Sequence, residues 1–270
     1  MNDLRIVGLS LAMALLGSAA WAEETEEVDA SDPTKIYSYA GPGYKFTEFS
    51  NGDSLSELRA IGNIGFGNND MLLFEVGYGR YSGTIEGDEK QDGVTNGRLR
   101  YFHLFNMDYS VAKGYRGWAT QVDLQFEGDV KGTNGGNTLA IGALPAFGLS
   151  PSWSLFLPVN LVSTWGNDFK EHQGNGVSIA PLLVWGPENG PWPGFFLQIW
   201  PNYTRYISGD LDGEGGAAID LTTGWSITPT IVATATFQQN FDKDLRFYNP
   251  SSSSTAPNDW NLFAAVNFYF

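Results

Sequence analysis

The chain has 270 residues, no cysteine and a formal net charge of −15. The absence of cysteine excludes disulfides and thiolate metal sites, and the acidic balance argues against a nucleic-acid partner, which would need a basic face. The length suffices for one large barrel or for two small domains.

The N-terminus has the pattern of a cleaved export signal. Arg5 precedes an apolar run, and Ala20-Trp-Ala22 supplies a small-residue cleavage pattern. We therefore predict a signal peptide over 1–22 and a flexible, acidic periplasmic segment over 23–35. The rest of the chain has no run of about 18 apolar residues, so we predict no membrane-spanning helix.

From residue 36 onward, segments of strand character are separated by clusters of Gly, Asn, Asp and Pro. Short turns alternate with longer, more polar connections. This is the topology of an all-β, antiparallel up-and-down transmembrane barrel over 36–270, with both termini periplasmic. The twelve predicted strands are 36–49, 54–67, 71–83, 97–110, 117–129, 138–149, 153–166, 176–186, 194–208, 216–228, 231–247 and 260–270.

Alternation within the strands indicates which face meets lipid. In 117–129 one face is mainly apolar, and the other carries Gln121, Asp123, Gln125 and Glu127. Burying such carboxylates in an apolar core would be costly. A soluble β-sandwich or lipocalin-like barrel, with its apolar face inward, therefore fits less well than a membrane barrel with a wet lumen.

The last strand has the clearest alternation. Every second residue from Trp260 to Phe270 is apolar, with aromatic residues at both limits, as in a membrane-crossing strand with interfacial girdles. A chain that stops on such a strand resembles bacterial outer-membrane β-barrel proteins. The resemblance implies an outer-membrane location, contact with lipid and lipopolysaccharide, and recognition of the C-terminal strand by the barrel-assembly machinery.

The inward faces predict a channel lining that is both ionisable and aromatic, with a more apolar wall from about Leu144 to Val184. Such a lining suits a small aromatic or amphipathic solute, whose ring stacks while its polar groups are hydrogen-bonded. We predict a passive outer-membrane channel for a small solute. The residues predicted to line the lumen are Glu57, Arg59, Glu75, Arg98, Arg100, Phe102, Gln121, Asp123, Gln125, Glu127, Trp200, Asn202, Asp220, Gln238, Asn240 and Asp242.

The main alternative is a closed structural or adhesive barrel that is plugged by ion pairs between neighbouring strands. Two sets of pairs could form such a plug: Arg59 with Glu57 and Glu75, and Arg98 and Arg100 with Asp123 and Glu127.

Catalysis has less support, and we predict no enzyme, cofactor or metal site. Outer-membrane phospholipases are a twelve-stranded precedent for a lipid-active enzyme. Here His103 falls on an outward face where Thr120 is the nearest hydroxyl, yet a nucleophile needs its base within hydrogen-bond reach. His172 is predicted to be solvated in a polar loop. Asp210–Glu214 reads as an acidic surface loop that lacks the further ligands of a calcium motif.

Three stretches, Asn96–Phe105, Gly117–Phe126 and Asn160–Gly166, resemble transporters associated with the phenol meta-pathway of aromatic degradation. Twelve strands around an aromatic-rich lumen are also similar to nucleoside-specific channels. Both resemblances imply an outer-membrane channel.

Overall fold

The computed structural model describes residues 36–67, 69–85, 90–128, 130–131, 136–166, 169–186, 194–241 and 258–270. The predicted signal peptide over 1–22 and lead-in over 23–35 lie outside these residues. In the described ranges, no helix is long and apolar enough to cross a membrane.

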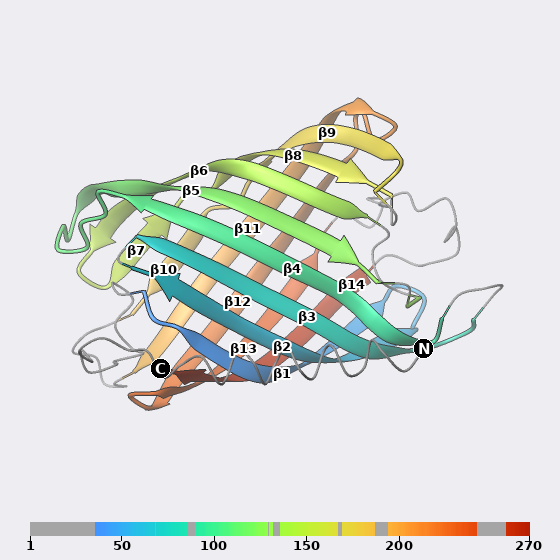
Figure 1. The fold of residues 1–270 in the computed structure, drawn as a ribbon, viewed down its shortest axis with the longest axis horizontal. Helices are drawn as coiled ribbons and strands as arrows, with labels where there is room; N and C mark the ends of the chain where they lie inside the picture. The colour runs from blue at the N-terminus through green and yellow to red at the C-terminus, as the bar shows by residue number, and fades with distance from the viewer. Residues whose placement is uncertain are drawn as a thin grey trace.

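The described chain is built from β-strands (Figure 1). They are β1 (Tyr39–Phe49), β2 (Ser54–Phe66), β3 (Asp70–Ser82), β4 (Asp92–Phe105), β5 (Gly114–Glu127), β6 (Asn137–Ser150), β7 (Trp153–Phe156), β8 (Val159–Trp165), β9 (His172–Ile179), β10 (Leu182–Trp185), β11 (Phe195–Gly209), β12 (Gly215–Thr228), β13 (Ile231–Asn240) and β14 (Asn258–Tyr269).

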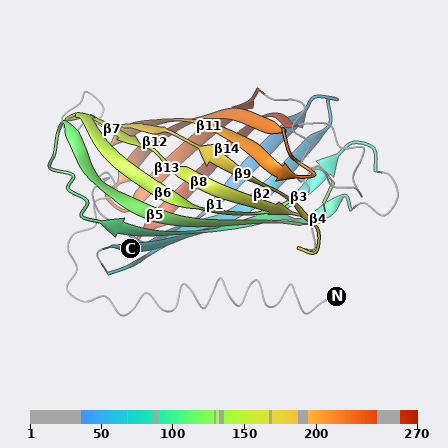
Figure 2. The ribbon, with the colours of Figure 1, turned by 90° about the horizontal axis from the view of Figure 1, so that it is seen from above.

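These strands close into one antiparallel barrel with twelve positions around its axis, as predicted (Figures 1 and 2). Each position, here called a stave, is filled by one strand or by two short strands in line. Strand β14 pairs with both β13 and β1, which leaves no free edge. Strands β7 and β8 both pair with β6, and β9 and β10 both pair with β11. Each of these two pairs is therefore one stave that is interrupted near its middle.

Both interruptions fall at prolines, which have no N–H to donate to the sheet ladder. Pro158 separates β7 from β8, and Pro181 separates β9 from β10. Hydrogen bonds beside the breaks keep the staves together: Leu157 N donates to Pro145 O at 3.0 Å, and Ala180 N donates to Pro158 O at 3.1 Å. The sequence-based prediction missed both breaks.

Several predicted strand boundaries were wrong by more than two residues, and the largest shifts of a strand start are in the strands predicted over 97–110 and 176–186. The strand predicted over 97–110 is β4, and it starts at Asp92 and ends at Phe105. Asn106 has φ 48°, in the left-handed region, which ends the strand. The strand predicted over 176–186 begins at His172, so this histidine belongs to a strand and not to a loop.

Side-chain exposure confirms the predicted orientation of the two faces. Leu58 and Leu161 point outward and are 69% and 71% exposed. Their sequence neighbours Glu57 and Asn160 point into the barrel and are buried. Apolar residues outside and polar residues inside are the reverse of a soluble barrel, and this arrangement excludes the lipocalin-like alternative.

The two ends of the barrel differ. Tyr39 and Tyr269 pair at one end, here called the turn end because it carries the tight turns at 151–152 and 229–230. The opposite, or loop, end carries the connections from β3 to β4 and from β13 to β14. The prediction that the turn end faces the periplasm remains an expectation.

Apolar clusters lie inside the barrel near both ends. At the turn end, Phe102, Leu104 and Ala119 pack with Leu73 and Leu144. At the loop end there are two clusters, one of Phe49, Leu55, Tyr81 and Val130, and one of Val162, Tyr206 and Leu211. Between the two ends, the inward surface is mainly polar.

Candidate functional site: the lumen cavity

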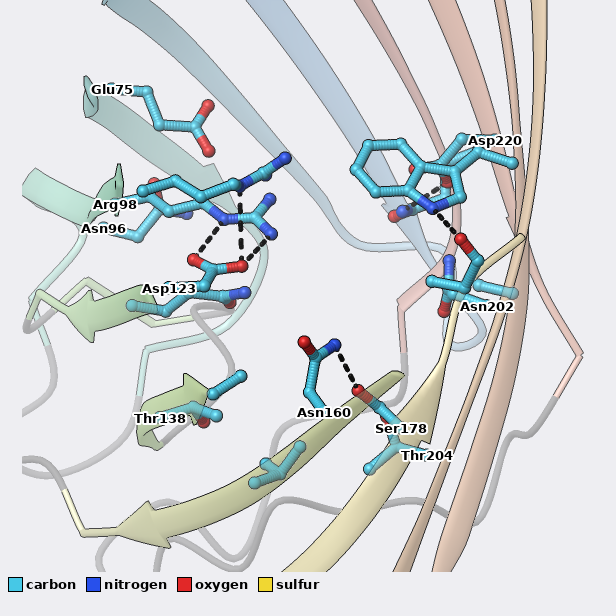
Figure 3. Close-up of a pocket in the computed structure, with 18 of the residues that line it drawn as sticks. Glu75, Asn96, Arg98, Asp123, Thr138, Asn160, Ser178, Asn202, Thr204 and Asp220 are labelled. Carbon is cyan, nitrogen blue, oxygen red and sulfur yellow. Dashed lines mark hydrogen bonds and ion pairs between the residues drawn. The ribbon is translucent and has the colours of Figure 1, made fainter. Parts of the chain in front are cut away.

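The middle of the barrel contains a cavity of about 490 Å³. Its wall carries thirteen of the residues that the sequence analysis assigned to the lumen: Arg59, Glu75, Arg98, Arg100, Gln121, Asp123, Gln125, Glu127, Trp200, Asn202, Asp220, Gln238 and Asn240. Figure 3 shows Glu75, Arg98 and Asp123 on one side of this space, with Asp220 and Asn202 across from them.

The other three predicted lining residues lie elsewhere. Glu57 points into the barrel but does not line the cavity, and only 1% of its side chain is exposed. Phe102 packs in the apolar cluster at the turn end. Asp242 lies outside the described residues.

A first ion-pair network joins β1, β2 and β3. Arg59 Nη1 lies 3.3 Å from Glu57 Oε1, and Arg59 Nη2 lies 3.4 Å from Glu75 Oε2. Lys45 Nζ lies 3.8 Å from Glu57 Oε2. Thr95 Oγ1 donates to Glu57 at 2.5 Å. Glu57 is thus compensated by two cations and a hydroxyl, which a buried carboxylate needs.

A second network on β4 and β5 is less balanced, because two guanidinium groups share one carboxylate. Arg98 binds Asp123 through two hydrogen bonds, from Nε to Oδ1 at 2.8 Å and from Nη2 to Oδ2 at 2.5 Å. Arg100 Nε lies 3.5 Å from the same Oδ2. The buried Arg100 Nε has no hydrogen-bond partner among the described residues.

The predicted ion pairs are therefore partly confirmed. Arg59 pairs with Glu57 and Glu75, and Arg98 and Arg100 pair with Asp123. The prediction that Glu127 joins the second set was wrong, because no arginine of the described chain lies within ion-pair distance of it. Glu127 aligns with Asn96 on β4, so it lies closer to the loop end than Asp123 does.

The wall from about Leu144 to Val184, which was predicted to be more apolar, also carries amides and hydroxyls. Gln121 Nε2 donates to Asn160 Oδ1 at 2.5 Å, and Asn160 Nδ2 donates to Ser178 Oγ at 3.0 Å. Figure 3 shows the second of these bonds at the edge of the cavity. The alternation of β8 could have placed Asn160 inward. Asn96 was also missed, because it was assigned to a loop, yet it accepts a 2.5 Å hydrogen bond from Arg59.

Opposite the second network, β12, β13 and β14 carry another polar chain. Gln238 Nε2 donates to Asp220 Oδ1 at 2.7 Å, and Asn261 Nδ2 donates to Gln238 Oε1 at 2.5 Å. Of these three residues, the sequence analysis did not assign Asn261 to the lining.

Trp200 and Arg100 meet across the bore. The guanidinium carbon of Arg100 lies 5.4 Å from the centre of the Trp200 ring and 6.0 Å from that of Phe102. Four staves separate β4 from β11 along one side of the barrel and six along the other, so this contact crosses the lumen. The Trp200 indole N–H donates to Ala180 O at 2.9 Å, beside the break at Pro181.

Neither histidine lies in the lumen. His103 faces outward, as predicted, and its register partner is Thr120. His103 Nδ1 lies 2.7 Å from Asp70 Oδ1, which also accepts a hydrogen bond from Tyr101 at 2.5 Å. The Asp70 carboxylate could orient the imidazole, but among the described residues no hydroxyl is hydrogen-bonded to His103, so no nucleophile lies beside it.

A serine lies instead beside His172. Ser163 Oγ and Asn175 Oδ1 both lie 3.1 Å from His172 Nε2, and the serine donates to the same asparagine oxygen at 2.7 Å. A nucleophile, its base and the group that orients the base would use the two different ring nitrogens. Here both neighbours meet one nitrogen, so the cluster is a surface hydrogen-bond triangle and not a catalytic relay.

No family model matches the chain, and no curated protein matches it in sequence. The fold is similar to that of solved outer-membrane channels. An outer-membrane channel of Pseudomonas putida F1 has a TM-score of 0.57 at 12% identity, with 92% of this chain and 100% of that one covered. The KdgM porin has a TM-score of 0.51 at 8% identity, with 86% and 99% covered.

The NanC porin is similar to the same degree, with a TM-score of 0.50 at 7% identity, and with 87% of this chain and 99% of that one covered. At these identities the likeness concerns the fold. The protein therefore has the closed, apolar-outside β-barrel fold of bacterial outer-membrane channels.

Proposed function

We propose that this barrel is a passive channel of the bacterial outer membrane for a small solute of aromatic or amphipathic character. The observation that carries the proposal is the cavity in the middle of the bore, which is lined by charges, amides and an indole. Its volume falls within the roughly 300–1,000 Å³ of small-molecule sites. No part of the proposal requires catalysis.

Reconstitution in planar lipid bilayers tests this function. Stepwise ionic current is expected from the purified wild-type barrel, and a folded barrel that never conducts, at any voltage, would contradict the proposal. Two neighbouring positions on β13 make a matched pair of variants. Thr236 lines the cavity, whereas Phe237 points outward. Thr236→Trp should lower the conductance several-fold, and Phe237→Trp should leave it unchanged.

A closed structural or adhesive barrel is the second candidate. The apolar clusters favour it, because they place packed side chains inside the barrel near both of its ends. If the ion pairs complete the plug, the wild type is silent and the double variant Arg98→Ala, Arg100→Ala conducts. Silence in both proteins would rule out a charge plug.

We also propose the partners that the sequence implies. The outward apolar face would contact outer-membrane lipid and lipopolysaccharide, and the barrel-assembly machinery would recognise the last strand through Phe270. Phe270→Ala should slow insertion of newly made barrel into the outer membrane, measured by the heat-dependent gel mobility of folded barrels. An unchanged assembly rate would contradict this role.

A further inference from the structure

We propose that Arg100 and Trp200 together form a binding site for a flat aromatic anion, such as an aryl carboxylate. This inference rests on the proposed channel function and names the class of solute that the channel selects. The site lies where the two side chains meet across the lumen.

The first step of the argument is the incomplete pairing of Arg100. Its nearest carboxylate oxygen, Asp123 Oδ2, lies 3.5 Å away and already accepts a 2.5 Å hydrogen bond from Arg98. The buried Nε of Arg100 has no hydrogen-bond partner within the described part of the chain. A guanidinium group is built to bind a carboxylate through two parallel hydrogen bonds, and that geometry is unfilled at Arg100.

The second step is the fixed position of the indole. Trp200 donates its N–H to the carbonyl of Ala180, beside the proline that interrupts this stave. That bond holds the ring on the β11 wall, while its π surface carries the guanidinium group of Arg100 at 5.4 Å. An aromatic face that accepts a guanidinium group also accepts another aromatic ring.

The third step concerns the sign of the charge. The other two arginines of this wall lie nearer to the carboxylates that serve them: Arg59 to Glu57 and Glu75, and Arg98 to Asp123. The acid beside Trp200 in the register is Asp220, and it already accepts a hydrogen bond from Gln238 at 2.7 Å. An incoming carboxylate would supply the hydrogen bonds that Arg100 lacks, whereas a cation stacked on Trp200 would find Asp220 already hydrogen-bonded to Gln238.

In the bound state, the solute ring would stack on the indole in place of the guanidinium group. Arg100 would turn toward the carboxylate of the solute and keep its charge beside Asp123. The cavity on which both side chains open offers about 490 Å³ for this exchange.

The test measures binding directly, with the full-length barrel in detergent micelles and 4-fluorobenzoate as the probe, observed by fluorine NMR. We expect line broadening that unlabelled benzoate reverses. Cyclohexanecarboxylate, which has the charge without the ring, and benzylammonium, which has the ring with the opposite charge, should each compete about tenfold less well. Equal competition by benzylammonium would overturn the charge assignment, and equal competition by cyclohexanecarboxylate would overturn stacking.

Two variants separate the roles of the pair. Arg100→Gln should abolish the preference for benzoate over benzylammonium, and Trp200→Leu should abolish the preference for benzoate over cyclohexanecarboxylate. The matched controls are Arg80→Gln and Trp225→Leu, because both side chains are exposed on the outer surface. If either lumen variant keeps the full wild-type preference, the site is not where we place it.

The binding test and the conductance test can fail independently of each other, so the two proposals are distinguishable. A wild-type barrel that conducts ions but does not broaden the fluorobenzoate signal would refute this inference and leave the channel intact. A barrel that binds fluorobenzoate at Arg100 and Trp200 but never conducts would refute the proposed channel and support the binding site.

Discussion

Two walls of the lumen differ in the continuity of their strands and in the side chains that they carry. The wall formed by β1 to β5 is continuous, and its charged side chains compensate one another in networks around Glu57 and Asp123. The wall from β6 to β11 is interrupted at Pro158 and Pro181, and it offers amides, hydroxyls and an indole. An interrupted ladder leaves backbone groups that side chains must satisfy, as the Trp200 indole does for the Ala180 carbonyl.

The largest effect is expected at the centre of the charged wall. Glu57→Ala would leave Arg59 and Lys45 without their shared carboxylate. Breaking such a buried pair should cost about 3–5 kcal/mol of the free energy of unfolding. Urea unfolding of the barrel in detergent measures it. Asp212→Ala, in an exposed turn at the loop end, is the control, and an equal loss in both variants would contradict a special role for Glu57.

A smaller effect is expected at Gly77 on β3, where the lack of a side chain leaves space for the network around Glu57. A Cβ at Gly77 would lie 2.4 Å from Thr95 Oγ1 and 2.8 Å from Glu57 Oε1. Gly77→Ala should therefore displace the carboxylate and cost about 1–3 kcal/mol, the usual effect of overpacking. Gly186→Ala is the matched control, because nothing lies within 4 Å of a Cβ at that position. Equal stability of the two variants would show that the network adapts freely.

On the interrupted wall, we expect the loss of one hydrogen bond to lower the free energy of unfolding by about 1 kcal/mol. Trp200→Phe keeps an aromatic ring but leaves the Ala180 carbonyl without its indole donor. The free energy of unfolding should fall by that amount. Phe196→Tyr, another aromatic change on β11, provides a comparison outside the cavity wall. A loss as large as that of Glu57→Ala would mean that both walls depend on buried polar pairing to the same degree.

The smallest effect is expected outside the lumen. His172→Ala removes one corner of an exposed hydrogen-bond triangle and should change the free energy of unfolding by less than about 0.5 kcal/mol. Lipid hydrolysis by purified barrel should stay at background in both wild type and variant. Hydrolysis that disappears with His172 would overturn the interpretation of this cluster as structural.

Local alternation was enough to predict the staves, the direction of most side chains and the general composition of the lumen. The period of two is a property of a single strand, so residues such as Gln121 and Leu58 could be assigned to a face without knowing their neighbours. The resemblance to outer-membrane barrels rested on the same local property, in the strand from Trp260 to Phe270.

Contacts between strands needed the closed barrel. The sequence could not place Trp200 against Arg100, because the two residues are about 100 positions apart in the chain and meet only when the sheet closes on itself. Register likewise decided that Glu127 lies away from the arginines and that Asn96 contacts Arg59. A single strand fixes which way a side chain points, and only its neighbours and the curvature of the barrel fix what that side chain meets.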